Sequence, residues 1–193
     1  MAASFIRAAG AQMILLLALV PMSAMAQADG KNCAILLVQA KGGSSGLSAL
    51  GRKLEPVCGT RAVSPADVAK QIKSLRQQGA KRVVLVGHAA GANAALAFAG
   101  SSGDAEGVVV LGGDASGNSE FGELPELAGN VKQHVPLLWV VGSGDPLHKR
   151  GEDYAFAKAP PHPFSRYVSV KADAAGTPEA AAKAVIEWLK SLE

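Results

Sequence analysis

The strongest constraint on the fold is a series of short apolar runs that polar residues barely interrupt. Each run ends in a turn or is followed by a segment with helical spacing. A strand that is apolar at nearly every position is buried on both faces, which occurs in parallel sheets covered by helices on both sides. The sequence therefore predicts a doubly wound, mostly parallel α/β sheet of about six strands. The expected strands are residues 33–40, 56–63, 82–87, 107–111, 136–142 and 166–170.

Helical segments separate these strands. Val68, Ile72 and Leu75 recur on one helical face after Ser64, a typical N-cap residue, and Gly79 is a typical helix terminator. Similar spacing predicts helices near residues 47–54, 90–99 and 177–192. No repeat or linker divides residues 27–193, so we expect one domain.

The first 26 residues have the pattern of a secretory signal peptide. Arg7 precedes an apolar run at residues 13–20, and Ala24-Met25-Ala26 resembles a cleavage site. The run is shorter than the roughly 20 residues that a transmembrane helix needs. We therefore expect an exported protein, periplasmic or secreted, with no membrane span after cleavage.

The two cysteines, Cys33 and Cys58, are expected to meet. Each opens one of two neighbouring parallel strands, which places both at the same end of the sheet. Export to an oxidising compartment would allow a disulfide between them. The alternative is a pair of reduced, half-buried thiols.

Composition excludes several functions. The formal net charge is +3, and no basic run or aromatic platform suggests nucleic-acid binding. No histidine or further cysteine lies at metal-ligand spacing, so neither a metal nor a cofactor is expected. Nothing in the sequence indicates an oligomeric state.

The most informative stretch is residues 83–99, which predicts a strand, a tight turn and a helix. Gly87 and Gly91 flank the turn, where side chains would collide with the neighbouring strand and helix. The central residue, Ala89, is expected to adopt a strained backbone conformation. The pattern resembles the G-H-S-x-G nucleophile elbow of α/β-hydrolases. In this resemblance Ala89 stands at the nucleophile position, and Ala90 follows it beside the oxyanion site.

The resemblance to α/β-hydrolases extends over residues 33–192 in the expected order. Residues 142–146 follow a strand and match the acid loop of that family, with Asp145 at the position of the acid. Residues 172–178 match the histidine loop, but Ala174 occupies the position of the histidine. The fold class that the resemblance implies is a minimal α/β-hydrolase fold, with a cleft at the carboxyl ends of the strands.

The oxyanion loop also departs from the family. Relatives often have His-Gly after the first strand, whereas this chain has Gln39-Ala40 followed by Lys41. We expect Lys41 at the oxyanion position. The glycine-rich residues 112–122 are expected to overhang the cleft.

Serine-hydrolase chemistry needs a hydroxyl nucleophile, an imidazole base and an orienting carboxylate. Ala89 and Ala174 supply neither of the first two. The remaining histidines are not expected to replace them. The side chain of His88 should point away from the site, His148 could approach the cleft, and His134 and His162 precede strands at the opposite end of the sheet.

Three functional interpretations remain open. The first is a natural pseudoenzyme whose cleft binds a small acyl-type ligand. The second is an alanine-substituted form of an active periplasmic serine esterase or acyl hydrolase, because alanine is the usual experimental replacement. The third is a non-catalytic protein that binds a macromolecular partner. A dinucleotide site is disfavoured, because the turn lacks the G-x-G-x-x-G pattern.

Overall fold

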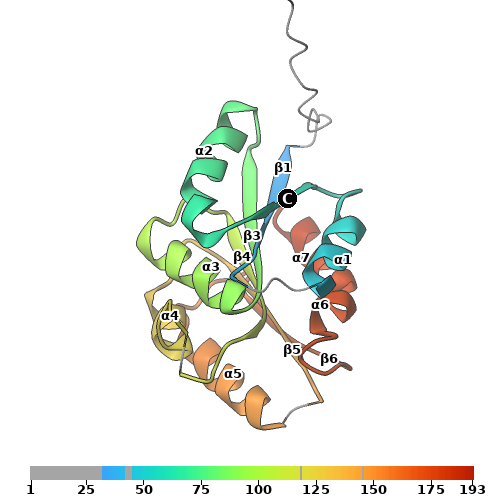
Figure 1. The fold of residues 1–193 in the computed structure, drawn as a ribbon. Helices are drawn as coiled ribbons and strands as arrows, with labels where there is room; N and C mark the ends of the chain where they lie inside the picture. Colours follow the sequence, from blue (N-terminus) through green and yellow to red (C-terminus); the bar gives the residue numbers. More distant parts are fainter. Residues whose placement is uncertain (1–31, 42–44, 118, 145) are drawn as a thin grey trace, which may run out of the picture.

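A computed structural model describes residues 32–41, 45–117, 119–144 and 146–193. Within these ranges six parallel strands form one sheet in the order β2-β1-β3-β4-β5-β6 (Figure 1). This confirms the predicted α/β class. The proposed signal peptide lies outside the described residues. The strands are β1 (Cys33–Val38), β2 (Gly59–Val63), β3 (Arg82–Ala89), β4 (Gly107–Gly113), β5 (Leu137–Gly142) and β6 (Arg166–Val170).

Helices cover both faces of the sheet (Figure 1). One face carries α2, α3, α4 and α5, and the other carries α1, α6 and α7. The helical elements are α1 (Ser45–Leu54), η1 (Pro65–Asp67), α2 (Val68–Gln77), α3 (Ala90–Ser101), α4 (Leu124–Asn130), α5 (Pro146–Lys158), α6 (Thr177–Ala180) and α7 (Ala182–Ser191).

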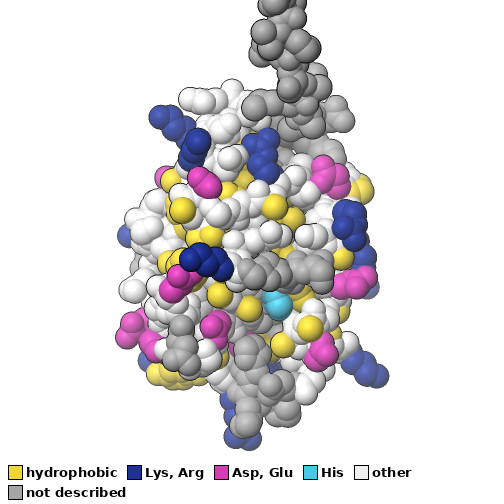
Figure 2. Space-filling model, viewed as in Figure 1, with side chains coloured by type: hydrophobic (Ala, Val, Ile, Leu, Met, Phe, Trp, Pro, Cys, Tyr) yellow, Lys and Arg dark blue, Asp and Glu magenta, His cyan; other side chains and the backbone are white. Residues whose placement is uncertain are grey.

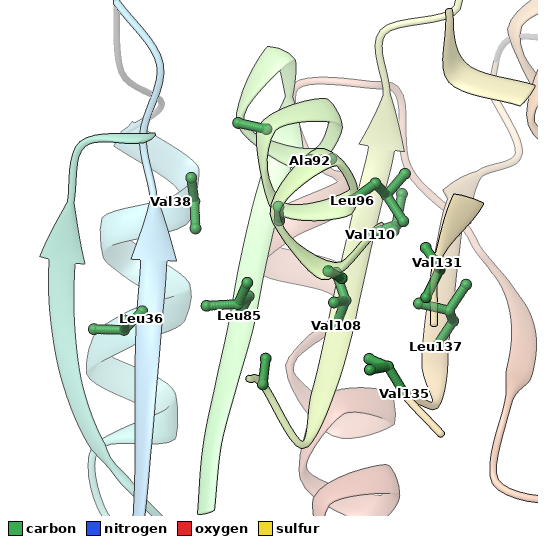
Figure 3. Close-up of a cluster of buried hydrophobic side chains, with 14 of the residues drawn as sticks. Leu36, Val38, Leu85, Ala92, Leu96, Val108, Val110, Val131, Val135 and Leu137 are labelled. Atoms are coloured by element: carbon green, nitrogen blue, oxygen red, sulfur yellow. The ribbon is translucent and has the colours of Figure 1, made fainter. Parts of the chain in front are cut away.

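The core consists of two apolar layers, one on each side of the sheet. Successive residues of a strand point to opposite faces, so Leu85 packs against α3 while Val84 and Val86 face α1 and α7. Figure 3 shows the α3 side, where Leu96 packs onto Leu85, Val108 and Val110. Each such side chain contributes about 1.5–3 kcal/mol when fully buried.

Three helical details differ from the sequence predictions. The helix after Ser64 begins with the 3₁₀ turn η1, and the Ser64 hydroxyl donates to the Asp67 carboxylate (2.7 Å) instead of capping the backbone. The C-terminal helix is broken into α6 and α7. Helices α4 and α5 were not predicted, since α4 is short and α5 buries the carboxylate Glu152, which interrupts the apolar spacing of a core-facing helix.

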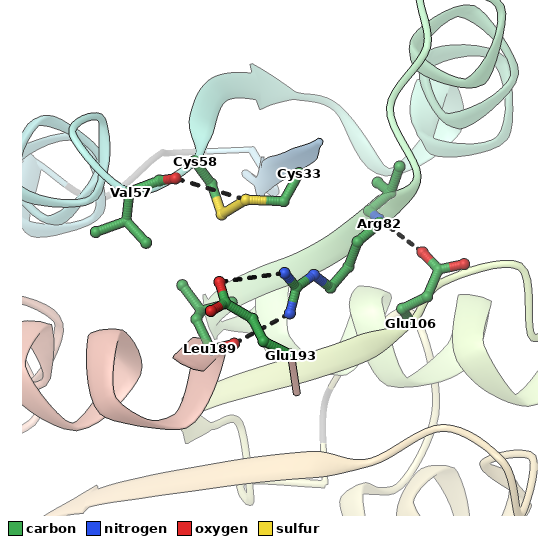
Figure 4. The surroundings of a disulfide bond; sticks show 8 residues. Cys33, Val57, Cys58, Arg82, Glu106, Leu189 and Glu193 are labelled. Atoms are coloured by element: carbon green, nitrogen blue, oxygen red, sulfur yellow. Dashed lines mark hydrogen bonds and ion pairs between the residues drawn. A yellow bond between two sulfur atoms is a disulfide. The ribbon is translucent and has the colours of Figure 1, made fainter. Parts of the chain in front are cut away.

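The predicted disulfide joins Cys33 at the start of β1 to Cys58 just before β2, with 5.2 Å between the two Cα atoms. Figure 4 shows that it lies near Arg82, at the start of β3. The Arg82 guanidinium donates to the Leu189 carbonyl oxygen (3.1 Å) and pairs with the Glu193 carboxylate (3.6 Å). The sheet is therefore cross-linked at the amino-terminal ends of its strands, whereas loops follow the carboxyl-terminal ends.

Replacing both cysteines by alanine should lower the free energy of unfolding by about 3–4 kcal/mol, because the bond closes a 25-residue separation in the unfolded chain. Urea denaturation of the oxidised protein and the variant measures the difference. As a control, reductant should destabilise the unmodified protein and leave the variant unaffected. Equal midpoints, or two free thiols in non-reducing mass spectrometry, would contradict the prediction.

Candidate active site

The turn between β3 and α3 has the geometry of a nucleophile elbow. Ala89 has φ 49° and ψ −125°, and it is the one non-glycine residue with positive φ in the described ranges. This confirms the strained conformation expected at this position. This positive-φ conformation is unfavourable for alanine by about 1–3 kcal/mol, so the surrounding packing must impose it. The side chain of Ala89 is exposed at the carboxyl edge of the sheet.

The two flanking glycines provide that packing. A Cβ on Gly87 would lie 2.3 Å from the Gly91 carbonyl oxygen and 2.5 Å from the Ala92 nitrogen. A Cβ on Gly91 would lie 2.3 Å from the Val38 carbonyl oxygen. These atoms belong to backbone and cannot move aside easily. Glycine is therefore required at both positions, as the sequence pattern predicted.

The structure brings the predicted histidine loop to the elbow. His88 Nε2 lies 2.9 Å from the Ala174 carbonyl oxygen, and this contact requires the imidazole proton on Nε2. The expectation that His88 points away from the site is wrong. The pairing of β3 with β4 shifts register between His88 and Ala89, and the half-buried His88 ring meets the loop after β6.

The acid loop also contacts the histidine loop. The backbone N–H of Ser143 donates to the Val170 carbonyl oxygen (2.9 Å), and that of Gly144 donates to the Ala172 carbonyl oxygen (3.0 Å). A Cβ on Gly142 would lie 2.7 Å from the same Ala172 oxygen, so the two loops are tightly packed. Asp145 itself lies outside the described residues. The structure thus places the residues before Asp145 close to Ala174.

The predicted oxyanion loop follows β1 on the other side of the elbow. The Gln39 N–H donates to the Val63 carbonyl oxygen (2.9 Å), which holds the start of this loop against β2. Lys41 is exposed, and Ala90 is half-buried at the first position of α3. The close approach of Gly91 to Val38 joins the end of β1 to the first turn of α3. The predicted elbow and oxyanion positions therefore lie at one edge of the sheet.

One buried residue that the sequence analysis missed is Asn93 on α3. Its side-chain oxygen accepts from the Asp114 N–H (2.9 Å), and its amide donates to the Asp114 carbonyl oxygen (3.1 Å). This reciprocal pair holds the loop after β4 beside α3, where Glu120 and Phe121 line a groove. A single polar residue in an alanine-rich helix was the signal that could have identified it.

The gathered loops lack the groups that acyl transfer needs at the predicted positions. Ala89 has no hydroxyl, Ala174 has no imidazole, and the His88 ring is engaged with a carbonyl oxygen. No cluster of three or more potential metal ligands occurs among the described residues. Burial, aided by Asp153, raises the pKa of Tyr167, but this residue lies on β6 beneath α5 and not at the elbow.

No sequence profile of a known family matches the chain, and no curated protein matches it. Several solved structures, however, match the chain in three dimensions. A dienelactone hydrolase from Anabaena variabilis is 18% identical with a TM-score of 0.64, covering 85% of this chain and 88% of its own. The esterase domain of a Rhodothermus marinus protein is 16% identical with a TM-score of 0.61, covering 89% of each chain. An α/β hydrolase from Sphaerobacter thermophilus is 11% identical with a TM-score of 0.58, and the match covers 81% of this chain and 92% of the hydrolase. The chain therefore has a minimal α/β-hydrolase fold.

Replacing Ala89 by glycine should raise the free energy of unfolding by about 1 kcal/mol, because glycine adopts positive φ without a steric penalty. The matched control is Ala97→Gly in the middle of α3, which should lower it by at least about 0.5–1 kcal/mol. Urea denaturation measures both. A loss of stability at Ala89 similar to that at Ala97 would mean that Ala89 is not left-handed in solution.

Proposed function

We propose that this chain is a pseudoenzyme with an α/β-hydrolase fold, in which the cleft binds a small ligand and does not hydrolyse it. The observation that supports this most directly is the elbow itself. Ala89 retains the strained backbone of a nucleophile position, but its methyl group cannot attack a carbonyl carbon. Ala174, at the predicted histidine position, offers no imidazole, and its carbonyl oxygen lies 2.9 Å from Nε2 of His88, the residue before Ala89.

The elbow persists without a serine because its geometry depends on backbone packing. Gly87 and Gly91 maintain the tight turn whatever the side chain at residue 89. Loss of a catalytic triad removes on the order of a millionfold in turnover and leaves only binding and oxyanion effects. A chain that keeps the scaffold and lacks the triad is therefore suited to binding.

The main alternative is an active esterase that carries alanine at two catalytic positions. A third departure from the family argues against it, because Gln39-Ala40-Lys41 replaces the usual oxyanion loop. Two substitutions at the triad would not change that loop. Loss of one oxyanion donor costs about 100- to 1,000-fold in turnover.

The unmodified protein should not react with a fluorophosphonate probe and should hydrolyse p-nitrophenyl acetate no faster than a denatured control. The double variant Ala89→Ser/Ala174→His should hydrolyse the ester only slowly, because the oxyanion loop has diverged as well. The single variants serve as matched controls. An increase of several orders of magnitude in the hydrolysis rate of the double variant would instead identify a substituted esterase. Labelling of the unmodified chain by the fluorophosphonate probe would mean that the nucleophile lies elsewhere.

Export to an oxidising compartment is part of the proposal. The Cys33–Cys58 disulfide supports it, because such bonds are rare in the reducing cytosol. No described helix is long and apolar enough to cross a membrane.

Expression of the full chain in a Gram-negative host should yield a mature protein that begins at Gln27 in the periplasmic fraction. Intact-mass spectrometry of that fraction checks the cleavage site. The matched control is a chain in which Leu15 and Leu16 are replaced by arginine, which should stay uncleaved in the cytoplasm because the apolar run is interrupted. Recovery of the unmodified chain only as an uncleaved cytoplasmic protein would refute export.

A further inference from the structure

Helix α3 has no charged residue, although part of its surface is open to solvent. Its sequence is AGANAALAFAGS, whereas the neighbouring surface helix α2 carries Lys70, Lys73 and Arg76. Apart from Asn93 and Ser101 the residues of α3 are alanine, glycine, leucine and phenylalanine, and a helix this apolar is normally buried over most of its surface. Ala97 and Phe98 nevertheless remain only half-buried. The open side of α3 is therefore an apolar surface that the rest of the described chain covers only in part.

This open side forms the floor of a groove of about 820 Å³. Ala94 and Ala97 lie three residues apart on one face of the helix, and their methyl groups leave space that longer side chains would fill. Pro65 of η1 and Phe121 of the loop after β4 also line the groove. Figure 2 shows hydrophobic side chains on this face among scattered charged ones. The volume is in the range of small-molecule sites, about 300–1,000 Å³.

The groove is separate from the catalytic positions. Neither Ala89 nor Ala174 lines it, and it shares with the elbow region only the loop after β1, through Gln39, Ala40 and Lys41. A ligand here would lie along the flank of α3 and not above the elbow. A site of this kind can bind without any contribution from the missing triad.

The charges on the rim favour an uncharged ligand. Lys41 and Glu120 both line the groove, so its rim carries one positive and one negative side chain. An anion or a cation would meet one attractive and one repulsive charge there, and neither would offset its loss of hydration against the apolar floor. Gln39, which is half-buried, supplies a neutral amide that can both donate and accept. The hydroxyl groups of Ser64 and Ser101 already donate within the protein, to Asp67 and to the Phe98 carbonyl oxygen.

The aromatic side chains of the groove favour a flat ligand. Phe98 and Phe121 both line it, and neither ring stacks on another aromatic ring within the described residues. Aromatic pairs gain about 0.5–1.5 kcal/mol beyond their buried area. Alanine methyl groups form a smooth floor against which a planar ring system can lie.

We propose that the groove beside α3 binds a neutral aromatic ligand, with its rings against Ala94, Ala97 and the two phenylalanines and a polar substituent near Gln39. This goes beyond the proposed function, because it adds a ligand site on the flank of α3 that is separate from the cleft above the elbow.

Two fluorescent probes with the same anilinonaphthalene rings test the charge preference. The mature full-length protein should bind neutral N-phenyl-1-naphthylamine saturably at one site, at least about tenfold more tightly than anionic 8-anilinonaphthalene-1-sulfonate. Displacement tests the shape, since 1-naphthol should compete at lower concentration than 1-octanol. No saturable binding of the neutral probe, equal or tighter binding of the anion, or stronger competition by 1-octanol would each overturn the proposal.

Substitutions in the groove test where the probe binds. Ala97→Leu should lower the affinity for the neutral probe by about tenfold or more, because the larger side chain fills the floor of the groove. Ala69→Leu, on the exposed face of α2 and outside the groove, should leave binding unchanged. Circular dichroism checks that each variant is folded, and Phe121→Ala, in a loop, should also weaken binding if Ala97→Leu fails to fold. Unchanged binding in the folded groove variants would overturn the proposal.

The same preparation separates this inference from the proposed function. Hydrolysis of p-nitrophenyl acetate is measured alongside probe binding. Binding with no turnover supports both. If the probe binds and the ester is hydrolysed, only the proposed absence of catalysis is refuted. If the probe does not bind and the ester is not hydrolysed, only the aromatic site is refuted.

Discussion

The structure depends on the close contact between the first turn of α3 and the end of β1. The Val38 carbonyl oxygen lies where a side chain on Gly91 would begin, and Gly91 in turn occupies the space beside Gly87. Because backbone meets backbone at both places, the chain can pass from β3 into α3 only through a sharp turn. The positive φ of Ala89 follows from that turn, and the surrounding loops are arranged around it.

This constraint explains how the tight turn forms with alanine at its centre. The histidine loop is held by the His88 side chain at the Ala174 carbonyl oxygen, and the acid loop by backbone bonds from Ser143 and Gly144. None of these contacts uses a serine or a histidine of a triad. The bonds that position the loops therefore form with alanine at residues 89 and 174.

Three features escaped the sequence predictions, each for a different reason. Helix α5 buries Glu152, whose carboxylate accepts from the Trp139 indole N–H, so the helix lacks the apolar spacing that would have revealed it. His88 was expected to face away because local pattern alone does not show which loop returns to the end of β3. The groove beside α3 was also missed, since its lining combines segments that are distant in sequence.

Local sequence pattern was enough to predict the parallel sheet from unbroken apolar runs and the tight turn from Gly87 and Gly91. It also favoured a disulfide, which the structure confirms between cysteines near the starts of adjacent strands. The contact of the Ala174 loop with the elbow, and the open uncharged side of α3, became visible in the folded chain alone. Those outcomes depend on which loops and helices approach one another after the sheet has formed, and contacts between distant segments leave no periodic signal in the sequence.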